Sequence, residues 1–464
     1  MRGEGCWMPT RHPHHRVREV PYKASALACC LLSACSGGGG SAPVGATRYA
    51  DAVHFDEPLS RLHPPHRKTS SNPIQHVVVI IQENQSFDHL FNGYPGANTV
   101  STGMTHTGAT VPLVEQHLGA GPNTEHFSTD FLLDYDGGRM DGFDLNTASE
   151  KPYLGAYHFI DPNDIQPYIQ MANQYVLSDN YFSSHIDASF VAHQYLIAAQ
   201  ANQAVDVPSG RWGCSVLTDD FVASLNPDRT VGALQAPCFN YTTLADELDS
   251  AGLTWHDYSP GIQASGGAWS PYQAVSHIYN GPDWKADVIS PETQILEDIP
   301  NGILSNVTWV TPDTANSDHP GSGSLTGPSW VASIVNAIGE SPFWDSTVIF
   351  VTWDEWGGEY DHVPPPYEDY DGDGFRVPLL CISPYAYSGV VNHTQLESAG
   401  IPKFIEKTFG LATLAAADAR ATPADSGCTN PSLSTPRTFT GISASYSRNY
   451  FLHEKHHNVP PDDY

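Results

Sequence analysis

Two runs of apolar residues, 76–81 and 348–353, are each followed by acidic and amide side chains. These side chains are Glu83, Asn84, Asp354 and Glu355. Apolar runs of this kind are typical of strands buried on both faces, and ligands of an open α/β sheet collect at the carboxyl ends of its strands. An all-oxygen ligand set favours a hard divalent ion such as Ca²⁺, Mg²⁺ or Mn²⁺. The pattern predicts one shared metal site; the alternative is two acidic loops that never meet.

A shared site also requires the backbone to leave the strand geometry after each run. Successive side chains of a strand point to opposite faces, so neighbours such as Asp354 and Glu355 cannot both reach one ion from a regular strand. Gly357 and Gly358 follow this pair closely. Glycine adopts turn conformations easily, so we expect the backbone to turn there.

Ser189 is the candidate nucleophile. It comes just before the helix-like stretch 191–200, where its hydroxyl and the neighbouring amides would face an incoming anion. A hydroxyl is a weak nucleophile until a base or a metal ion lowers its pKa. The same position also suits a serine that caps a helix, so the pattern leaves both roles open.

The elements that position these residues alternate along the chain. Further strands are predicted over residues 176–178, 252–256, 307–311 and 377–383. Helices are predicted over residues 165–174, 244–251, 330–338 and 402–409. Alternating strands and helices predict a three-layer α/β/α sandwich with a largely parallel central sheet. The segments 97–160, 205–240 and everything after 412 are interpreted as loop-rich insertions over one domain, 73–455.

The first 35 residues have the composition of an export signal. A basic stretch, an apolar run over 24–32 and small residues up to Cys35 form a secretory pattern. Its end, Leu32-Ser33-Ala34-Cys35, resembles a bacterial lipoprotein box, in which the cysteine is acylated. We therefore expect export to the periplasm or cell surface, a lipid anchor at Cys35, and a flexible tether over 36–72. The alternative is an ordinary cleaved signal without lipid. Residues 456–464 are expected to form a frayed tail.

The composition excludes several classes of protein. The chain has 464 residues, with 51 Asp and Glu against 21 Lys and Arg, which gives a formal net charge of −30 at pH 7. Such an acidic chain cannot neutralise nucleic-acid phosphates or dock unaided on anionic lipid. Its 40% of hydrophobic residues is enough for a buried core and excludes a disordered chain.

Four cysteines follow the predicted signal, and export would allow them to form disulfides. Cys214 and Cys238 flank one loop and are the expected pair. Cys381 lies in an apolar run and is interpreted as a small buried hydrophobe. None of the four has CxxC spacing, so a zinc site built on cysteine is not expected.

Five blocks of the sequence resemble the bacterial phosphoesterase family, in the family's order. They are ENQSFDHLF (83–91), GGRMDGF (137–143), SDNYFSS (178–184), SDHP (317–320) and TWDEWGGEYDHVPPP (352–366). This family contains phosphatidylcholine-type phospholipases C and acid phosphatases within the alkaline phosphatase superfamily. The resemblance implies an alkaline phosphatase-like fold over most of the mature chain.

The resemblance also implies a role for individual residues. The implied metal ligands are Glu83, Asn84, Asp354, Glu355 and Ser189. Ser189 would also be the nucleophile, and the implied histidines of the phosphate pocket are His126, His319 and, as a weaker match, His256. Where many relatives have Asp-Pro-Asn after the nucleophile, this chain has Phe190-Val191-Ala192-His193. His193 either compensates for the missing acid or only packs.

The sequence therefore predicts an exported, metal-dependent hydrolase that cleaves phosphate esters through a phosphoseryl intermediate. A monoester and a diester, including a phospholipid, both remain open as substrates. One alternative is a non-catalytic surface lipoprotein that binds a metal or a phosphorylated ligand on the same scaffold. Another is a sulfatase, but the C/S-x-P-x-R setting typical of that chemistry does not surround Ser189.

Overall fold

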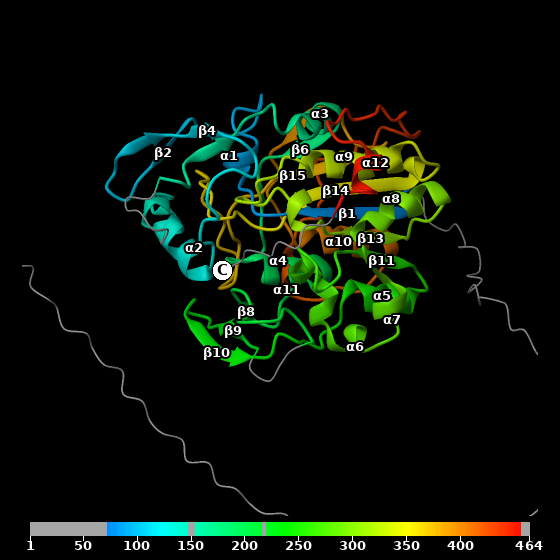
Figure 1. Ribbon diagram of the computed structural model, residues 1–464, viewed down its shortest axis with the longest axis horizontal. Coiled ribbons are helices and arrows are strands. Elements are labelled where there is room, and N and C mark those ends of the chain that lie inside the picture. The colour runs from blue at the N-terminus through cyan, green and yellow to red at the C-terminus, as the bar shows by residue number, and fades with distance from the viewer. Residues whose placement is uncertain (1–71, 147–153, 216–219, 456–464) are drawn as a thin grey trace, which may run out of the picture. The chain divides into compact units, whose positions relative to one another are not determined.

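An eight-stranded sheet forms the centre of the computed structural model, which describes residues 72–146, 154–215 and 220–455 (Figure 1). In spatial order its strands are β12 (Val288–Ile289), β11 (Trp255–Tyr258), β13 (Val307–Val310), β1 (His76–Gln82), β14 (Thr347–Trp353), β15 (Leu379–Ile382), β6 (Val176–Ser178) and β16 (Val390–Asn392). Within this sheet β15 is antiparallel to both of its neighbours, and the other paired strands are parallel. The predicted, largely parallel sheet is confirmed.

Helices cover both faces of this sheet (Figure 1). One face carries α3 (Gln166–Gln174), α8 (Ile295–Asp298), α9 (Gly327–Gly339) and α12 (Arg448–Phe451). The other face carries α4 (Ser189–Ala198), α5 (Leu244–Ala251), α10 (Gly400–Phe409) and α11 (Ala416–Arg420). The three layers of the predicted α/β/α sandwich are therefore present.

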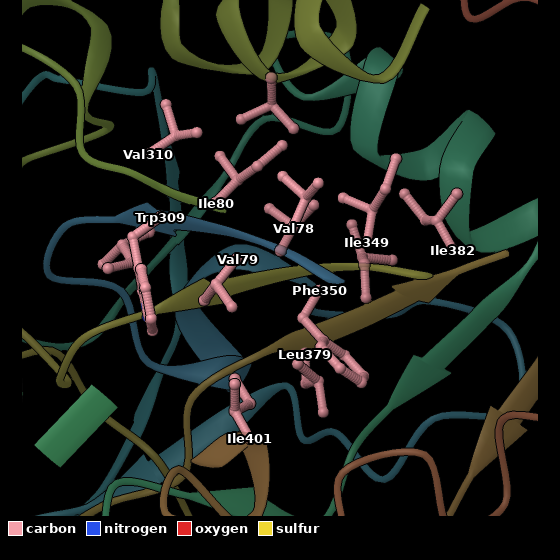
Figure 2. Close-up of a cluster of buried hydrophobic side chains, with 14 of the residues drawn as sticks. Val78, Val79, Ile80, Trp309, Val310, Ile349, Phe350, Leu379, Ile382 and Ile401 are labelled. Carbon is pink, nitrogen blue, oxygen red and sulfur yellow. The ribbon is translucent and has the colours of Figure 1, made fainter. Parts of the chain in front are cut away.

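The core lies on both sides of the central strands because helices cover each face. Val77 to Ile81 of β1 are all 0% exposed, which explains why this strand is apolar throughout instead of alternating. Figure 2 shows the two sides of the sheet. Val78, Ile80, Val310, Ile349 and Ile382 point to one side, and Val79, Trp309, Phe350 and Leu379 point to the other, toward Ile401 of α10.

The register of the central strands sets the position of the residues that follow them. β1 lies between β13 and β14 and is parallel to both. Gln82, the last residue of β1, pairs with Trp353, the last residue of β14. The two strands therefore end level with each other, and the polar residues that follow begin side by side.

The predicted insertions contain small elements of their own. The segment 97–160 holds two two-stranded sheets, β2 (Thr102–Met104) with β3 (Thr110–Pro112) and β4 (Val114–Gln116) with β5 (His158–Ile160), and the helix α2 (Ser128–Tyr135). Later sheets pair β8 (Ala204–Val205), β9 (Val222–Leu225) and β10 (Val231–Gln235), and β7 (Tyr181–Phe182) with β17 (Leu396–Glu397). The remaining short helices are α1 (Phe87–Leu90), α6 (Ser276–Tyr279) and α7 (Asp283–Ala286).

One predicted strand is displaced. The sequence places it over 252–256, whereas β11 spans Trp255–Tyr258. Gly252 instead adopts the left-handed conformation (φ 69°) that ends α5, and its N–H donates to Leu248 O and Asp249 O. A glycine in this position is typical of helix C-termini, so the chain needs two more residues before it can enter the sheet.

The disulfide prediction is half right. Cys214 and Cys238 are bonded, as expected. The interpretation of Cys381 as a lone buried residue is wrong, because it is bonded to Cys428. The segment after 412 folds back onto the end of β15, where Tyr387 N donates to Cys428 O and Ala386 bridges Thr429. An apolar setting suits a half-cystine as well as a thiol, so the surroundings of Cys381 could not reveal its partner.

Several predictions fall outside the described residues. The signal segment 1–35 with Cys35, nearly all of the tether 36–72, and the tail 456–464 belong to this group, and they stay predictions. Among the helices of the described ranges, none has the length and apolarity to span a membrane.

Candidate active site

The two acidic segments meet at the carboxyl ends of β1 and β14. Asp354 N donates to Gln82 O at 3.0 Å, and Asn84 N donates to Asp354 Oδ1 at 3.0 Å. The four side chains are at most 2% exposed: Glu83, Asn84, Asp354 and Glu355. The alternative of two separate acidic loops is therefore wrong, while the role of these side chains as metal ligands stays a prediction.

The backbone turns out of the strand geometry at both segments, as a shared site requires. Asn84 has φ 60° and Gly357 has φ 65°. Asparagine tolerates this left-handed region better than most residues. A Cβ at Gly357 would lie 2.5 Å from Asn84 O, so the glycine also allows the two turns to pack against each other.

Glu355 makes different contacts from Glu83, Asn84 and Asp354. Its Oε2 accepts from Gly357 N at 2.7 Å, within its own turn. Its Oε1 lies 3.6 Å from His126 Nε2. Glu355 therefore closes the turn and faces the histidine.

Ser189 points into this group of side chains from the first turn of α4. Its hydroxyl lies 3.1 Å from Glu83 Oε2 and 3.3 Å from Asn84 Oδ1. The N-cap of α4 is Ala188, so the alternative role of Ser189 as the helix cap is wrong. The hydroxyl bonds to Glu83 and Asn84, which follow β1, and its role as nucleophile stays a prediction.

His193 also belongs to the site, one helical turn after Ser189. Residues four apart lie on the same face of a helix, and His193 Nε2 lies 2.8 Å from Glu83 Oε1 and 3.8 Å from Asp354 Oδ2. The sequence left open whether this residue takes part or only packs, and its contacts place it among the acids. A spacing of four from the candidate serine was the signal that could have found it.

Burial and a neighbouring acid shift the pKa of Asp354. Burial, and then the neighbouring Glu83 carboxylate, raise the pKa of Asp354 to about 8. Asp354 Oδ2 accepts no hydrogen bond from the residues that the structure describes. Buried charges are normally paired or bound to a metal. The ligand atoms of this site are therefore suited to a bound cation.

Two histidines hold the amide of Asn84. Asn84 Nδ2 lies 2.8 Å from His319 Nε2 and 3.3 Å from His126 Nε2. The Nδ1 atoms of the two rings face carbonyl oxygens of Pro320 and Thr124, at 2.8 and 2.7 Å. Because a carbonyl only accepts, Nδ1 carries the proton in both rings and Nε2 accepts from Asn84. This arrangement turns Asn84 Oδ1 toward Ser189.

His256 does not lie with the other predicted residues. On β11 it pairs with Thr308, which pairs with Val78 of β1. Val78 precedes Glu83 by five residues, or about 16 Å along an extended strand, and His256 Nδ1 lies 3.3 Å from the hydroxyl of Tyr258. The placement of His256 in a phosphate pocket is corrected: β11 starts late, so this residue is in the body of the sheet.

The fold and the site together define an α/β protein with a buried serine, carboxylates and histidines at the carboxyl edge of a largely parallel sheet. The chain belongs to the Phosphoesterase family, whose model matches residues 74–412. The expected family is therefore confirmed.

Curated relatives of the chain include bacterial and plant phospholipases C. It is 24% identical to the hemolytic phospholipase C of Pseudomonas aeruginosa, over 77% of this chain and 56% of that protein. It is 24% identical to the non-specific phospholipase C1 of Arabidopsis thaliana, over 75% of this chain and 68% of that protein. The chain spans little more than half the length of the Pseudomonas and Burkholderia relatives that it matches.

Solved structures with similar folds are more distant. An alkaline phosphatase superfamily protein from Vibrio parahaemolyticus has a TM-score of 0.33 and 10% identity, over 73% of this chain and 67% of that one. Murine ectonucleotide pyrophosphatase/phosphodiesterase 5 has a TM-score of 0.34 and 9% identity, over 74% of this chain and 96% of that one. Both scores are low, so the fold rests on the sheet and helices of this chain.

Proposed function

We propose that this protein is a metal-dependent hydrolase of phosphate esters, of the phospholipase C or acid phosphatase type, with Ser189 as its nucleophile. The observation that carries the proposal is the position of the Ser189 hydroxyl, 3.1 Å from Glu83 Oε2 and 3.3 Å from Asn84 Oδ1. Membership of the Phosphoesterase family and the phospholipase C relatives support the same reaction class.

The residues that would hold the divalent ion are Glu83, Asn84, Asp354, Glu355 and Ser189. The two buried carboxylates of Glu83 and Asp354, and the unpartnered Oδ2 of Asp354 among the described residues, fit a cation. A divalent ion bound there would supply positive charge for the phosphoryl oxygens and lower the pKa of the Ser189 hydroxyl. The formal charge of −30 makes such local positive charge necessary for an anionic substrate.

The chain's own residues would carry the two chemical steps. Ser189 Oγ would form a bond to phosphorus while the ester P–O bond breaks, and Glu83 Oε2 lies within reach of the serine proton. Water would then cleave the phosphoserine, which releases phosphate or a phosphorylated headgroup and restores the hydroxyl.

A proton must also reach the leaving oxygen. His126 and His319, the implied histidines of the phosphate pocket, are the candidate donors, but both Nε2 atoms accept from Asn84 in this arrangement. Either histidine could therefore act as the acid only after it takes up a proton and releases that amide.

Export and lipidation at Cys35 are part of the proposal. Two disulfides among the described residues, Cys214–Cys238 and Cys381–Cys428, support an oxidising compartment. Labelling of cells with a radioactive fatty acid should mark the wild-type protein and leave a Cys35→Ala variant unmarked. Equal labelling of both proteins would contradict an anchor at Cys35.

A paired assay tests the catalytic proposal. The purified mature chain is given p-nitrophenyl phosphate or p-nitrophenylphosphorylcholine, with and without a chelator. We expect hydrolysis that the chelator abolishes, and the preferred substrate would distinguish phosphatase from phospholipase C. Hydrolysis of neither compound would favour the alternative, a non-catalytic protein that binds a metal.

The serine has its own test. Ser189→Ala should lower kcat by a factor of about 10³ or more, while the metal stays bound because Glu83, Asn84, Asp354 and Glu355 remain. Ser333→Ala is the matched control, because Ser333 is a buried serine within α9 whose hydroxyl donates to Ser329 O. Normal turnover by Ser189→Ala would remove the nucleophile from the proposal.

A further inference from the structure

His193 reaches the candidate metal site from the same helix as the nucleophile. Its side chain is 1% exposed, and its Nε2 lies 2.8 Å from Glu83 Oε1 and 3.8 Å from Asp354 Oδ2. Ser189 faces the other oxygen of the same carboxylate, Glu83 Oε2, at 3.1 Å. One face of α4 therefore directs a hydroxyl and an imidazole at the two oxygens of Glu83.

The distances from His193 to the two acids are compatible with one shared ion. Glu83 Oε1, His193 Nε2 and Asp354 Oδ2 can act as one ligand each, and all lie within 4.8 Å of one another. Nitrogen and oxygen atoms bound at about 2.1 Å to a common ion lie up to about 4.2 Å apart. The distances from His193 to the two acids fall within this limit.

A hydrogen bond from His193 to Glu83 does not by itself provide donors for all the buried carboxylate oxygens of the site. It provides one donor, whereas the carboxyl groups of both Glu83 and Asp354 are buried beside it. Asp354 Oδ1 already accepts from Asn84 N, and Asp354 Oδ2 accepts from none of the described residues. The 3.8 Å between this oxygen and His193 Nε2 is too long for a hydrogen bond but suits two ligands of one ion.

We propose that His193 Nε2 is a nitrogen ligand of the bound ion, beside Glu83 and Asp354. Imidazole suits Zn²⁺ and other first-row transition ions, whereas Ca²⁺ and Mg²⁺ prefer oxygen. The site therefore takes a transition ion, such as Zn²⁺ or Mn²⁺, in preference to Ca²⁺ or Mg²⁺. This inference rests on the metal site of the proposed function. Of the three ions that oxygen ligands alone predict it favours Mn²⁺, and it adds Zn²⁺.

Pulsed electron paramagnetic resonance of the Mn²⁺-loaded mature chain tests the ligand directly. We expect the nitrogen coupling of a bound imidazole in the wild type, and its loss in His193→Gln, whose amide can still donate a hydrogen bond to Glu83. His256→Gln is the matched control, because His256 lies in the body of the sheet, and it should keep the coupling. The Zn²⁺ affinity should fall at least about tenfold in His193→Gln, with little change for Ca²⁺.

Each of the other outcomes contradicts either this inference or the metal dependence of the proposed function. Bound Mn²⁺ without nitrogen coupling in the wild type, or coupling that persists in His193→Gln, would overturn this inference and leave the proposed function intact. A wild type that hydrolyses phosphate esters but binds no ion would overturn the metal part of the proposed function as well. If His193→Gln does not fold, His126→Gln and His319→Gln replace it: coupling in both supports His193, and its loss in either contradicts it.

Discussion

At the scale of single residues, Asn84 connects the groups of the site. Its backbone N–H donates to Asp354, its side-chain amide donates to His319, and its side-chain oxygen lies 3.3 Å from the Ser189 hydroxyl. An aspartate at this position could not donate to a histidine Nε2 that lacks a proton. The Asn84 amide therefore donates to the histidine tautomer that the carbonyls of Pro320 and Thr124 fix, and its oxygen faces the serine.

Gly357 leaves room for Asn84, and a substitution of Gly357 tests whether turnover depends on the position of Asn84. In Gly357→Ala the new Cβ would lie 2.5 Å from Asn84 O and 2.8 Å from Asn84 Cβ. The residue must also stay at a positive φ, which costs about 1 kcal/mol. We expect kcat to fall at least about tenfold, because Asn84 must move, and the assay of phosphate-ester hydrolysis measures it.

Gly93→Ala separates the two effects of this change. Gly93 has φ 70°, but nothing lies within 4 Å of the position that a Cβ would take there. This control shares the backbone strain without the clash, so it should keep the wild-type kcat and lose only about 1 kcal/mol of stability. Equal kcat values for the two variants would show that the packing of Gly357 against Asn84 does not matter for turnover.

The sequence predicts which acids meet, but not how each side chain is used. Glu83 and Asp354 follow apolar runs that any parallel sheet brings to one edge, so their meeting follows from the pattern. The part played by His193 depends on the rotation of α4 about its axis, which is set by packing against the sheet. All ten residues of α4 are buried, so its sequence shows no polar face from which that rotation could be inferred.

At the scale of elements, Arg376 ties together the two segments that form the site. It is 0% exposed, and its guanidinium lies 3.2 Å from Asp88 Oδ1 and 3.1 Å from Asp361 Oδ2. Asp88 lies in α1, just after the first acidic segment, and Asp361 follows the second. The same side chain also donates to Asn98 O and Asp179 O. Arg376 thus fixes the distance between the ends of both loops.

Removal of this cation should destabilise the fold strongly. Arg376→Met leaves Asp88 and Asp361 buried without their partner, which should lower the free energy of unfolding by about 3–5 kcal/mol. Chemical denaturation measures the loss. Arg211→Met, at an exposed position, is the control and should change stability by about 0.5 kcal/mol or less. If Arg376→Met were as stable as the control, the two loops would be held by their other contacts.

The long apolar elements were predictable, whereas among the three-residue strands of the sheet β6 was predicted and β16 was not. The strand expected over 348–353 differs from β14 by one residue, and the helix expected over 244–251 is α5. The strand is a continuous apolar run, and the helix has apolar residues at a helical period. β16 has three residues and pairs with β6, far away in the chain. A short strand on the edge of a sheet is decided by its neighbours, which a single sequence does not reveal.

At the scale of the whole molecule, the formal charge of −30 overstates the charge of the folded chain. Burial raises the pKa of Asp257, Asp318 and Asp371 to about 7 each. These groups hold protons in the folded state that they release on unfolding. The opposite case is His89, whose pKa burial lowers to about 3. The acids should make the fold more stable as the pH falls below 7, and buried histidines oppose this below about pH 6.5.

Asp318 allows this proton uptake to be measured at one position. Its Oδ2 accepts from the hydroxyl of Tyr168 at 2.6 Å and from Trp353 Nε1 at 3.2 Å. Neither of these two partners is a candidate metal ligand. The folded pKa is about 7 and the ordinary value is 3.8. Between these values only the folded state binds the proton, so the contribution of Asp318 to stability grows as the pH falls from about 7 to about 4 and is absent above 7.

We therefore expect the unfolding free energy of the wild type, relative to Asp318→Asn, to rise by about 1.4 kcal/mol for each pH unit of acidification in that range. Urea unfolding at several pH values between 5 and 7.5 measures the difference, because the amide cannot titrate. Asp228→Asn is the control: Asp228 is exposed, and hydrogen bonds from Thr230 lower its pKa, so this variant should keep the wild-type slope. Parallel curves for wild type and Asp318→Asn would mean that Asp318 stays ionised inside the folded protein.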